Sequence, residues 1–471
     1  MGLLVQIAYL HSISNWRKSF FTANLEFLNQ FRYTLSMQMT FKRTALCQGS
    51  IEVPGDKSIS HRSLLLGSIA QGQTRVQGLL RSGDVLSTWK CLEKLGVSIN
   101  QENHSVIISG KNSTPFTGTS EPLNCGNSGT TARLLMGLLA GYPLSSELIG
   151  DASLSQRPMK RIADPLRQMG AKISLINDQT LPAQLEGSSS LQGIHYSLPV
   201  ASAQLKSALL LAGLKAQGDT VLSGETSSRD HTERMLQYFG VKLKFSNAPQ
   251  QSPFHPIISM KGNQILHARD IRVPGDISSA AFWIALALLV PHSQLEIRNV
   301  LLNPSRLGVI HVLERMGAKI KTELTSLDPE PVGNMWITHS ELKGTEILPH
   351  EVPSLIDEIP ILSLVACHAQ GITGLRGAKE LRVKETDRIE AIAFNLRAMC
   401  ARIETYPDGF DIEGPHPLSG AVLESFGDHR IAMTFAIAGL IADGETTLQG
   451  CECASISYPN FFETLQSLTR A

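Results

Sequence analysis

The sequence predicts an α/β protein made of six repeated units, arranged as two halves of three, and two internal repeats support this fold class. In the first repeat, a helical segment ends in glycine and leads into a strand in which apolar and polar residues alternate. This segment recurs at intervals of 70 to 83 residues. In the second, EVPGDKSISHRSLLLGSIA at 52–70 resembles RVPGDISSAAFWIALALLV at 272–290, which lies 220 residues further along the chain. Units of this length are larger than solenoid repeats, so each is expected to be an α/β supersecondary unit.

The glycine-ended segment occurs in four full copies, CLEKLGVSI (91–99), PLRQMGAKI (165–173), MLQYFGVKL (235–243) and VLERMGAKI (312–320). Each is expected to form a helix with one buried stripe, a left-handed turn at the glycine and then a strand. A fifth copy, NLRAMCARI (395–403), has Cys400 in place of the glycine. We interpret NFFETLQSL (460–468) as a sixth copy that stops at its helix.

The two VPGD sequences are expected to mark the places where the chain crosses between the halves. Proline and glycine interrupt regular structure, and each copy precedes an apolar helix rich in small residues. The chain would cross near Gly55–Lys57 and return near Val273–Asp276. The expected domains are therefore a first lobe at 57–273 and a second lobe made of 41–56 together with 274–471.

Residues 1–40 differ in composition from the rest, because their basic and aromatic residues are accompanied by a single acidic residue, Glu26. The order of basic and apolar residues is wrong for a signal peptide. We interpret the segment as an N-terminal extension, either a disordered tail or the product of an upstream start codon, with the working protein beginning near Met37 or Met39. Import into an organelle is the alternative, because transit peptides are also poor in acidic residues.

Composition excludes several classes of function. The 42 Lys and Arg residues balance 42 Asp and Glu residues, which argues against general binding to nucleic acid or to an anionic membrane but leaves room for a local basic pocket. The longest apolar runs, Ala280–Val290 and Ile431–Ala442, are too short for a membrane-spanning helix of about 20 residues and predict buried core helices. Seven cysteines without a CxxC pair predict reduced, mostly buried thiols in a cytoplasmic protein.

Cationic and hydroxyl residues recur where helices are expected to begin. The motifs are PGDKSISHR (54–62), CGNSGTTAR (125–133), GDASLSQRP (150–158), ASAQLKSALLLAG (201–213), SRDHTERM (228–235), RVKETDR (382–388) and FGDHRIAM (426–433). Each alone is also consistent with an ordinary capped helix, and the first lacks the G-x-x-x-x-G-K spacing of a P-loop. Together, helix N-termini that point into one cleft favour a ligand with several phosphates or carboxylates.

Two further features belong to these helix starts. Pro158, at the end of GDASLSQRP, is expected in the first turn of a helix. In PSLIDEIPIL (353–362), Asp357 and Glu358 lie inside an apolar run, where an ionised carboxylate is costly unless it is paired. We therefore expect cations to face these two carboxylates.

Taken in order, the motifs resemble those of the 5-enolpyruvylshikimate-3-phosphate (EPSP) synthases, also called 3-phosphoshikimate 1-carboxyvinyltransferases, from about Thr44 to Phe462. The resemblance implies a two-lobed inverse α/β barrel in which each lobe holds three βαβαββ units. It also implies transfer of the enolpyruvyl group of phosphoenolpyruvate to the 5-hydroxyl of shikimate 3-phosphate, with release of phosphate, on the way to chorismate and the aromatic amino acids. A cytoplasmic monomer without metal or organic cofactor is expected, with no nucleic acid or membrane partner.

The resemblance implies roles for individual residues. The expected contacts of shikimate 3-phosphate are Lys57, Ser58, Arg62, Ser202, Gln204, Arg229, Asp357 and Lys384. Those of phosphoenolpyruvate are Lys57, Gly129, Arg157, Gln204, Arg388 and Arg430. Asp357 is expected to accept the proton of the 5-hydroxyl. Glu385 and Lys57 are expected to form the acid/base pair that protonates the methylene carbon and later removes a proton.

Within the family, the resemblance is closer to one branch. Ala203, Glu380 and Ile456 stand where the other branch has Ser, Asn and Lys, so the chain is similar to class II members. Class II includes enzymes that tolerate the herbicide glyphosate, and tolerance is associated with alanine at the position of Gly129. The glycine here therefore implies sensitivity or only partial tolerance.

Three alternatives remain open on the sequence alone. The sister enolpyruvyl transferase that acts on UDP-N-acetylglucosamine typically uses a loop cysteine, or Asp in some members, as its catalytic acid, and this chain has no cysteine between Cys125 and Cys367. A non-catalytic anion-binding protein would be expected to lose Lys57, Asp357 or Glu385, which are all present. An RNA-processing relative would be expected to carry net basic charge.

Overall fold

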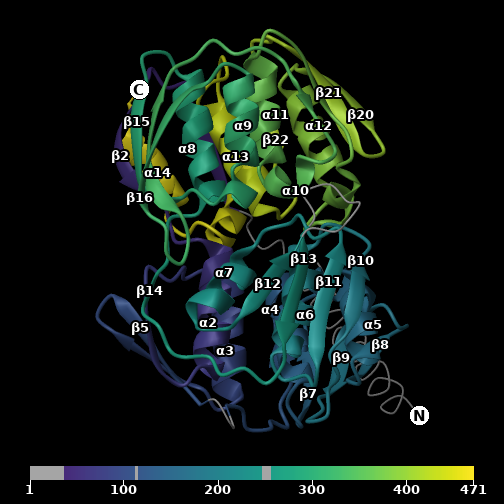
Figure 1. Cartoon of the computed structure of the whole chain (residues 1–471). Helices are drawn as coiled ribbons and strands as arrows, with labels where there is room; N and C mark the ends of the chain where they lie inside the picture. Colours follow the sequence, from purple (N-terminus) through teal and green to yellow (C-terminus); the bar gives the residue numbers. More distant parts are fainter. Residues whose placement is uncertain (1–36, 112–114, 247–255, 471) are drawn as a thin grey trace, which may run out of the picture.

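The computed structural model describes residues 37–111, 115–246 and 256–470. Its strands and helices separate into two lobes, one above the other in Figure 1. The strands of the first lobe are β3 (Gly72–Gln77), β4 (Ser98–Glu102), β5 (Ser105–Gly110), β6 (Leu123–Asn124), β7 (Ser145–Ile149), β8 (Lys172–Ile176), β9 (Thr180–Glu186), β10 (His195–Leu198), β11 (Asp219–Gly224), β12 (Leu243–Ser246), β13 (Ile257–Lys261) and β14 (Ile271–Arg272). Its helices are α2 (Lys57–Ile69), α3 (Gly83–Lys94), α4 (Gly129–Ala140), the 3-10 helix η1 (Leu154–Gln156), α5 (Lys160–Gln168), α6 (Ala203–Gly213) and α7 (His231–Tyr238).

The second lobe contains the rest of the described secondary structure. Its strands are β1 (Gln38–Phe41), β2 (Leu46–Glu52), β15 (Gln294–Leu301), β16 (Lys319–Ser326), β17 (Val332–Thr338), β18 (Glu346–Ile347), β19 (Gly371–Leu375), β20 (Arg402–Tyr406), β21 (Gly409–Gly414), β22 (Val422–Glu424), β23 (Thr446–Gln449) and β24 (Thr469–Arg470). Its helices are α8 (Ile277–Leu289), η2 (Pro304–Arg306), α9 (Gly308–Arg315), α10 (Val352–Leu355), α11 (Ile359–His368), η3 (Lys379–Val383), α12 (Arg388–Ala398), α13 (His429–Gly439), η4 (Cys451–Ile456) and α14 (Phe461–Leu468).

In the described residues, each lobe holds three small sheets with the same internal plan. The strand orders are β14-β3-β5-β4, β6-β7-β9-β8 and β10-β11-β13-β12 in the first lobe, and β16-β17-β15-β2-β24, β18-β19-β21-β20 and β1-β23-β22 in the second. Every sheet contains one parallel pair, such as β6 with β7, next to antiparallel strands such as β7 with β9. A parallel pair needs a helical crossover, so these sheets are the βαβαββ units that the sequence predicts. The sixth unit is completed by β1, which pairs antiparallel with β23.

The helix ends agree with the repeat that the sequence shows. Gly96, Gly170, Gly240 and Gly317 follow α3, α5, α7 and α9 with positive φ angles between 84° and 104°. Cys400 follows α12 and also has a positive φ, of 67°. Glycine takes this left-handed conformation without steric cost, which explains its recurrence. The expectation for Pro158 is wrong, because α5 begins only at Lys160 and the proline lies before the N-cap residue.

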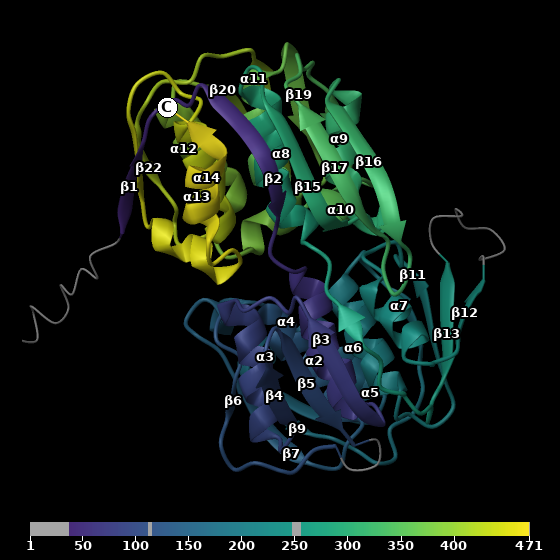
Figure 2. The ribbon, with the colours of Figure 1, turned by 90° about the vertical axis from the view of Figure 1, so that its left-hand side faces the viewer.

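Two strands are exchanged between the lobes where the chain crosses. β2 precedes α2 but pairs with β15 in the second lobe, and β14 precedes α8 but pairs with β3 in the first. The crossings lie side by side (Figure 2), with Gly55 bridged to Gly275. A Cβ atom at Gly55 would lie 2.1 Å from the carbonyl oxygen of Gly78. It would also lie 3.0 Å from a side-chain carbon of Val273. The VPGD glycine therefore permits the close approach of the first crossing to the turn after β3 and to the second crossing.

Each lobe has its own buried apolar cluster, one drawn from α2 to α7 and the other mainly from α8 to α14. All residues of α8 except Leu289 are buried, and α13 is buried throughout. Helices that are apolar on all sides belong in a core, and the two long apolar runs form such helices, as predicted. No helix in the described parts of the chain is long and apolar enough to cross a membrane.

The structure bears differently on the predictions for the N-terminus and for the cysteines. Residues 38–40, which the sequence analysis assigns to the extension, lie in β1, and the extension up to residue 36 lies outside the described residues. All seven cysteines are free thiols, and Cys400 and Cys453 are the ones that are not fully buried. The prediction of reduced, mostly buried cysteines is confirmed.

Candidate active site

One cavity of about 560 Å³ is lined by residues of both lobes. The first residues of several helices face it, among them Lys57 of α2, Gly129 of α4 and His429 of α13. Free backbone N–H groups at such positions favour an anion. The residues that the sequence predicts for the site all line this cavity: Lys57, Ser58, Arg62, Gly129, Arg157, Ser202, Gln204, Arg229, Asp357, Lys384, Glu385, Arg388 and Arg430.

The cavity is positively charged although the chain as a whole is neutral. Ten Lys and Arg side chains and six carboxylates are among its lining residues, which leaves an excess of four positive charges. A cleft lined by one sign of charge concentrates ligands of the opposite sign. The charge distribution therefore suits a ligand that carries several phosphate or carboxylate groups.

Lys57 is held where the two lobes meet. It is the first residue of α2, and Asp56 caps the helix by accepting a backbone N–H at 2.8 Å. Lys57 Nζ pairs with Asp84 Oδ2 of α3 at 3.1 Å, and its backbone N donates to Asp276 Oδ2 at 3.3 Å. Burial raises the pKa of Asp84, but the charges of Lys57 and His61 outweigh burial and keep the pKa below its usual range.

Arg62 lies one turn along α2 and is fixed by three helices. Its Nε donates to Thr232 Oγ1 of α7 at 2.6 Å. Its two terminal nitrogens donate to Ser207 Oγ of α6 at 2.7 Å and to the Ser58 carbonyl at 2.9 Å. Burial lowers the pKa of Arg62 to about 10, which leaves the guanidinium charged at neutral pH.

The start of α6 presents Ser202 and Gln204 to the cavity. Ser202 is the N-cap, and its hydroxyl accepts a backbone N–H at 3.4 Å. Gln204 accepts a hydrogen bond from Arg133 at 2.7 Å and donates one to Thr130 Oγ1 at 3.1 Å. Arg133 is itself buried and donates to the Pro158 carbonyl at 3.1 Å. The amide of Gln204 is thereby held in one orientation.

Arg157 is hydrogen-bonded to the loop that leads into Gly129 at the start of α4. Arg157 donates to Asn127 Oδ1 at 2.7 Å and to Ser153 Oγ at 3.1 Å, so its guanidinium is tied to the residues that precede Gly129. A Cβ atom at Gly129 would lie 2.9 Å from a terminal nitrogen of Arg133. Any larger residue there requires the Arg133 side chain to shift.

Asp357 lies in the turn between α10 and α11 and faces cations from both lobes. Its Oδ2 accepts a hydrogen bond from Arg229 of the first lobe at 2.5 Å. Its Oδ1 is 3.4 Å from Arg388 and 3.8 Å from Arg430. Burial raises the pKa of Asp357, but these cations together with Lys384 outweigh burial and hold the pKa well below its usual range. Asp357 is therefore an ionised carboxylate at neutral pH.

Glu385 shares the cation Arg388 with Asp357. Its Oε2 accepts a hydrogen bond from Arg388 at 2.8 Å, and its Oε1 is 3.7 Å from Arg157 of the first lobe. Burial raises the pKa of Glu385, but Arg388, His429, Arg157 and Lys57 lower it far more. The neighbouring Lys384 has its pKa lowered by burial, which Asp357 partly offsets.

Arg388 is the buried cation that joins these carboxylates. Its side chain is 1% exposed, and its Nε donates to Asp428 Oδ2 at 2.7 Å. Asp428 also caps α13 by accepting the backbone N–H of Arg430 at 2.8 Å. Burial lowers the pKa of Arg388, but the surrounding carboxylates raise it above its ordinary value. The two arginines are thus fixed by one aspartate.

Comparison with known proteins assigns the chain to a family. The family model described as EPSP synthase (3-phosphoshikimate 1-carboxyvinyltransferase) matches residues 42–465. The chain belongs to the EPSP synthase family. The family, the fold class and the enzyme class predicted from the sequence are confirmed.

Relatives in the EPSP synthase family match this chain over nearly its whole length. The 3-phosphoshikimate 1-carboxyvinyltransferase of Alkaliphilus oremlandii (strain OhILAs) is 47% identical over 436 residues, which cover 92% of this chain and 100% of the relative. That of Bacillus pumilus (strain SAFR-032) is 47% identical with the same coverage. The EPSP synthase structure from Acinetobacter baumannii has a TM-score of 0.81 at 41% identity and covers 92% of this chain and 98% of its own. The enolpyruvyl transferase NikO from Streptomyces tendae, with a TM-score of 0.73 at 17% identity over the same shares of the two chains, supports the fold alone.

Sequence reasoning missed several side chains that hold this EPSP synthase site together. Arg133 and Asp428 lie inside the motifs GNSGTTAR and GDHRIAM, so the motifs contained a signal that the analysis did not use. Asp84, which pairs with Lys57, and Arg306, which also lines the cavity, lie outside every motif. Nothing in their local sequence marks them.

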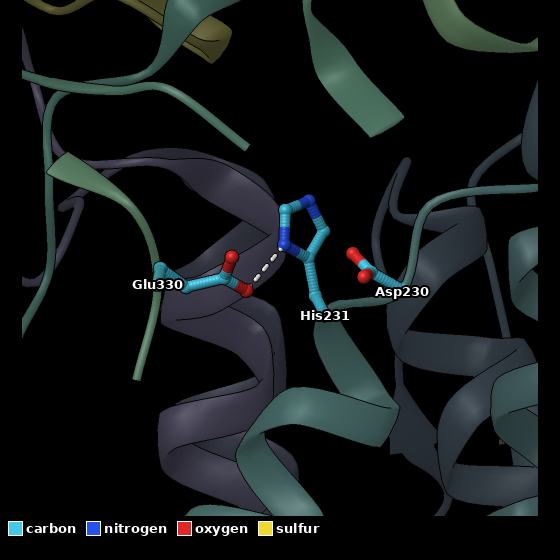
Figure 3. Close-up of side chains that lie close together, drawn as sticks. All are labelled: Asp230, His231 and Glu330. Atoms are coloured by element: carbon cyan, nitrogen blue, oxygen red, sulfur yellow. Dashed lines mark hydrogen bonds and ion pairs between the residues drawn. The ribbon is translucent and has the colours of Figure 1, made fainter. Parts of the chain in front are cut away.

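A group that resembles a metal site lies beside the EPSP synthase cavity. Possible ligand atoms of Asp230, His231 and Glu330 lie within 4.8 Å of one another (Figure 3). His231 Nδ1 is hydrogen-bonded to Glu330 Oε1 at 2.7 Å, and the Asn303 amide donates to both carboxylates at 2.7 Å. Arg234 also donates to Asp230 at 2.7 Å. Because N–H donors and a guanidinium already face the carboxylates, we interpret the group as a hydrogen-bonded joint between the lobes.

Proposed function

We propose that this chain transfers the enolpyruvyl group of phosphoenolpyruvate to the 5-hydroxyl of shikimate 3-phosphate, releasing phosphate, in the pathway to chorismate and the aromatic amino acids. The observation that carries the proposal is the position of Asp357 and Glu385 among cations of both lobes in one cavity. Both substrates carry a phosphate and a carboxylate, which suits the excess of positive charge. The names of the curated relatives support this choice of substrates.

On the acceptor side, Asp357 takes the proton of the 5-hydroxyl. A carboxylate with a strongly lowered pKa is a weak base, so its surroundings must change during binding. The phosphate of shikimate 3-phosphate, attracted to Arg229 and Lys384, offsets two of the cations that lower the pKa of Asp357. The pKa of Asp357 then rises towards the range of a working general base.

On the donor side, Glu385 delivers a proton to the methylene carbon. Phosphoenolpyruvate, attracted to Arg157 and Arg388, offsets the cations that hold the pKa of Glu385 down, so that the carboxyl group can carry a proton. The 5-hydroxyl oxygen bonds to carbon 2 as carbon 3 is protonated, which gives a tetrahedral intermediate. Removal of a proton from the new methyl group and departure of phosphate restore the double bond, with Lys57 as the second proton-transfer group.

The test measures phosphate release from phosphoenolpyruvate with shikimate 3-phosphate as acceptor. Glu385→Gln keeps the shape of the side chain and loses the titrating group, so kcat is expected to fall about 10²- to 10⁴-fold. Glu380→Gln is the matched control, because Glu380 also lines the cavity but is 51% exposed and pairs with Arg161 at 3.2 Å. Its kcat is expected to stay within about threefold, since exposed ion pairs contribute little.

Two outcomes would contradict the proposed function. One is phosphate release that does not require shikimate 3-phosphate. The other is a preference for UDP-N-acetylglucosamine as the acceptor, which would favour the sister transferase. In either case the cavity would serve a different reaction from the one proposed.

We also propose that the first lobe comprises 57–273, that the second comprises 41–56 with 274–471, and that the chain works as a cytoplasmic monomer. The paired crossings at Gly55 and Gly275 support these lobe limits. Every residue predicted for the site lines the cavity of one chain, so the proposed site is complete without a residue of a second chain. Free, mostly buried thiols support a reducing compartment.

A further inference from the structure

The turn at residues 303–306 of the second lobe contacts two aspartates, one at the crossing into the first lobe and one within the first lobe. It follows β15 and contains η2, and Asn303 is its N-cap. The two aspartates are Asp56, which directly precedes Lys57, and Asp230, which directly follows Arg229. Both neighbours are residues of the proposed site, so this turn acts next to two of the substrate-binding cations of the first lobe.

Arg306 makes the first of the two connections. One terminal nitrogen donates to Asp56 Oδ2 at 2.9 Å, and the other donates to Asp276 Oδ1 at 3.1 Å and to Ser278 Oγ at 2.7 Å. The side chain is 2% exposed. One guanidinium thereby joins the N-cap residues of α2 and α8, and only a planar fork reaches both carboxylates at once. Asp276 in turn accepts the backbone N–H of Lys57.

Asn303 and Ser305 make the second connection. Asn303 Nδ2 and Ser305 Oγ donate to Asp230 Oδ1 at 2.7 and 3.1 Å. The Asn303 amide also donates to Glu330 Oε2, and the other oxygen of Glu330 bonds to His231 at the start of α7 (Figure 3). Asn303 and Glu330 are fully buried, so water cannot replace these bonds when one is lost.

Two of the ion pairs across the cavity are open to competition from the substrates. Arg229 with Asp357 and Arg157 with Glu385 are groups that the substrates are proposed to engage. A substrate that pairs with these cations competes with the contacts between the lobes. Arg161 with Glu380 also joins the lobes, but both side chains are partly exposed. The turn at 303–306 adds a buried attachment whose bonds involve none of the proposed substrate contacts.

We propose that the turn at 303–306 is a positioning element, in which Arg306 and Asn303 set Lys57 and Arg229 of the first lobe against Asp357 and Glu385 of the second. The inference rests on the proposed function, because its effect is on the reaction between groups of both lobes. Most first-lobe contacts of shikimate 3-phosphate, such as Ser58 and Gln204, do not depend on this turn. Weakening the turn should therefore impair the reaction more than the binding of shikimate 3-phosphate.

The experiment compares Arg306→Lys and Asn303→Ser with the unsubstituted protein. Lysine keeps the positive charge of Arg306 but lacks the planar pair of terminal nitrogens that reaches two carboxylates. Serine keeps the N-cap function of Asn303 but lacks the amide that joins two carboxylates. In both variants kcat is expected to fall about 10- to 100-fold, because a displacement of about 1 Å at a reacting centre has effects of this size. The dissociation constant of shikimate 3-phosphate, measured by calorimetry, is expected to change less than about threefold.

The matched control is Arg315→Lys. Arg315 forms a fork with Glu351 in the same lobe, at 2.9 and 3.0 Å, but is 40% exposed and does not line the cavity. Its kcat is expected to be unchanged. Circular dichroism and thermal unfolding show whether each variant is folded.

Three results would overturn the inference. The first is folded variants that keep kcat within threefold, and the second is a loss of binding equal to the loss of kcat. The third is failure of both variants to fold, because a purely structural role of the turn would then explain the loss of activity. An inactive unsubstituted protein would instead contradict the proposed function itself, so the two failures are distinguishable.

Discussion

Asp357 is the carboxylate on which the charge balance of the cavity depends most. Burial alone would raise its pKa, but Arg430, Arg229, Lys384 and Arg388 lower it well below the usual range. A carboxyl group whose pKa is lower in the folded than in the unfolded protein stabilises the fold above the unfolded-state pKa, about 3.9. That stabilisation is lost as the pH falls further, through the folded-state pKa.

The substitution Asp357→Asn is therefore expected to lower the free energy of unfolding by about 1–3 kcal/mol at pH 7. The difference from the unsubstituted protein should be constant between pH 7 and about 4 and should shrink below pH 4. Urea unfolding at pH 7, 5 and 3 measures it. Asp443→Asn is the control, since Asp443 is 63% exposed and pairs with the exposed Arg43; a difference that grows towards acid pH would contradict the prediction.

Single residues were predictable from sequence where a local signal exists. Gly96 and its counterparts end helices in every full copy of the repeat, and Cys400 takes the same left-handed conformation although it has a side chain. The motif residues Lys57 and Glu385 were also found, because charges gather at a helix start. Arg306 was not, because its partners Asp56 and Asp276 are 250 and 30 residues away and only the folded chain brings them together.

At the scale of elements, the segment between η3 and α12 carries Lys384 and Glu385 and is anchored by one arginine. Arg382 Nε donates to the Pro407 carbonyl at 2.8 Å, and a terminal nitrogen donates to the Tyr406 carbonyl at 2.7 Å. These carbonyls lie at the end of β20 and in the turn that leads to β21. Arg382 thus ties the segment with the proposed acid to a hairpin of the second lobe.

Removal of this anchor by Arg382→Ala is expected to lower kcat/KM about tenfold or more, because Lys384 and Glu385 lose their fixed position. Hydrogen exchange of residues 379–387 should become faster in the variant. Arg402→Ala is the matched control, since Arg402 lies in β20 and makes only an exposed pair with Glu413 at 3.3 Å. Equal effects of the two substitutions would show that the anchor has no special role.

The order of helices and strands could be predicted from the sequence, but the pairing of strands could be predicted less well. The two long apolar runs identified α8 and α13 as buried helices, and the glycine-ended copies placed the following strands. The exchange of β2 and β14 was only implied by the two VPGD sequences. No local pattern predicted that β1 completes the sixth sheet, because β1 and its partner β23 lie at opposite ends of the chain.

At the scale of the whole molecule, a neutral chain concentrates positive charge in one cavity. Raising the NaCl concentration from 0.05 to 0.5 M shortens the range of electrostatic attraction. The KM of phosphoenolpyruvate is therefore expected to rise roughly three- to tenfold, with a smaller change in kcat. Steady-state kinetics at both concentrations measure this, and a fall in kcat at constant KM would be the opposite of what is predicted.

The exchange of strands between the lobes also determines an order of events during synthesis. Glu52 at the end of β2 pairs with Arg298 of β15, which is 246 residues further along the chain. A ribosome needs roughly 12–50 s to add a stretch of that length. The units of the first lobe are expected to form during this interval, and the lobe is complete once β14 has emerged, while β2 waits beside it as an unpaired strand edge. The newborn chain is therefore most prone to aggregation at β2, and a chaperone that acts on this protein would have most to protect there.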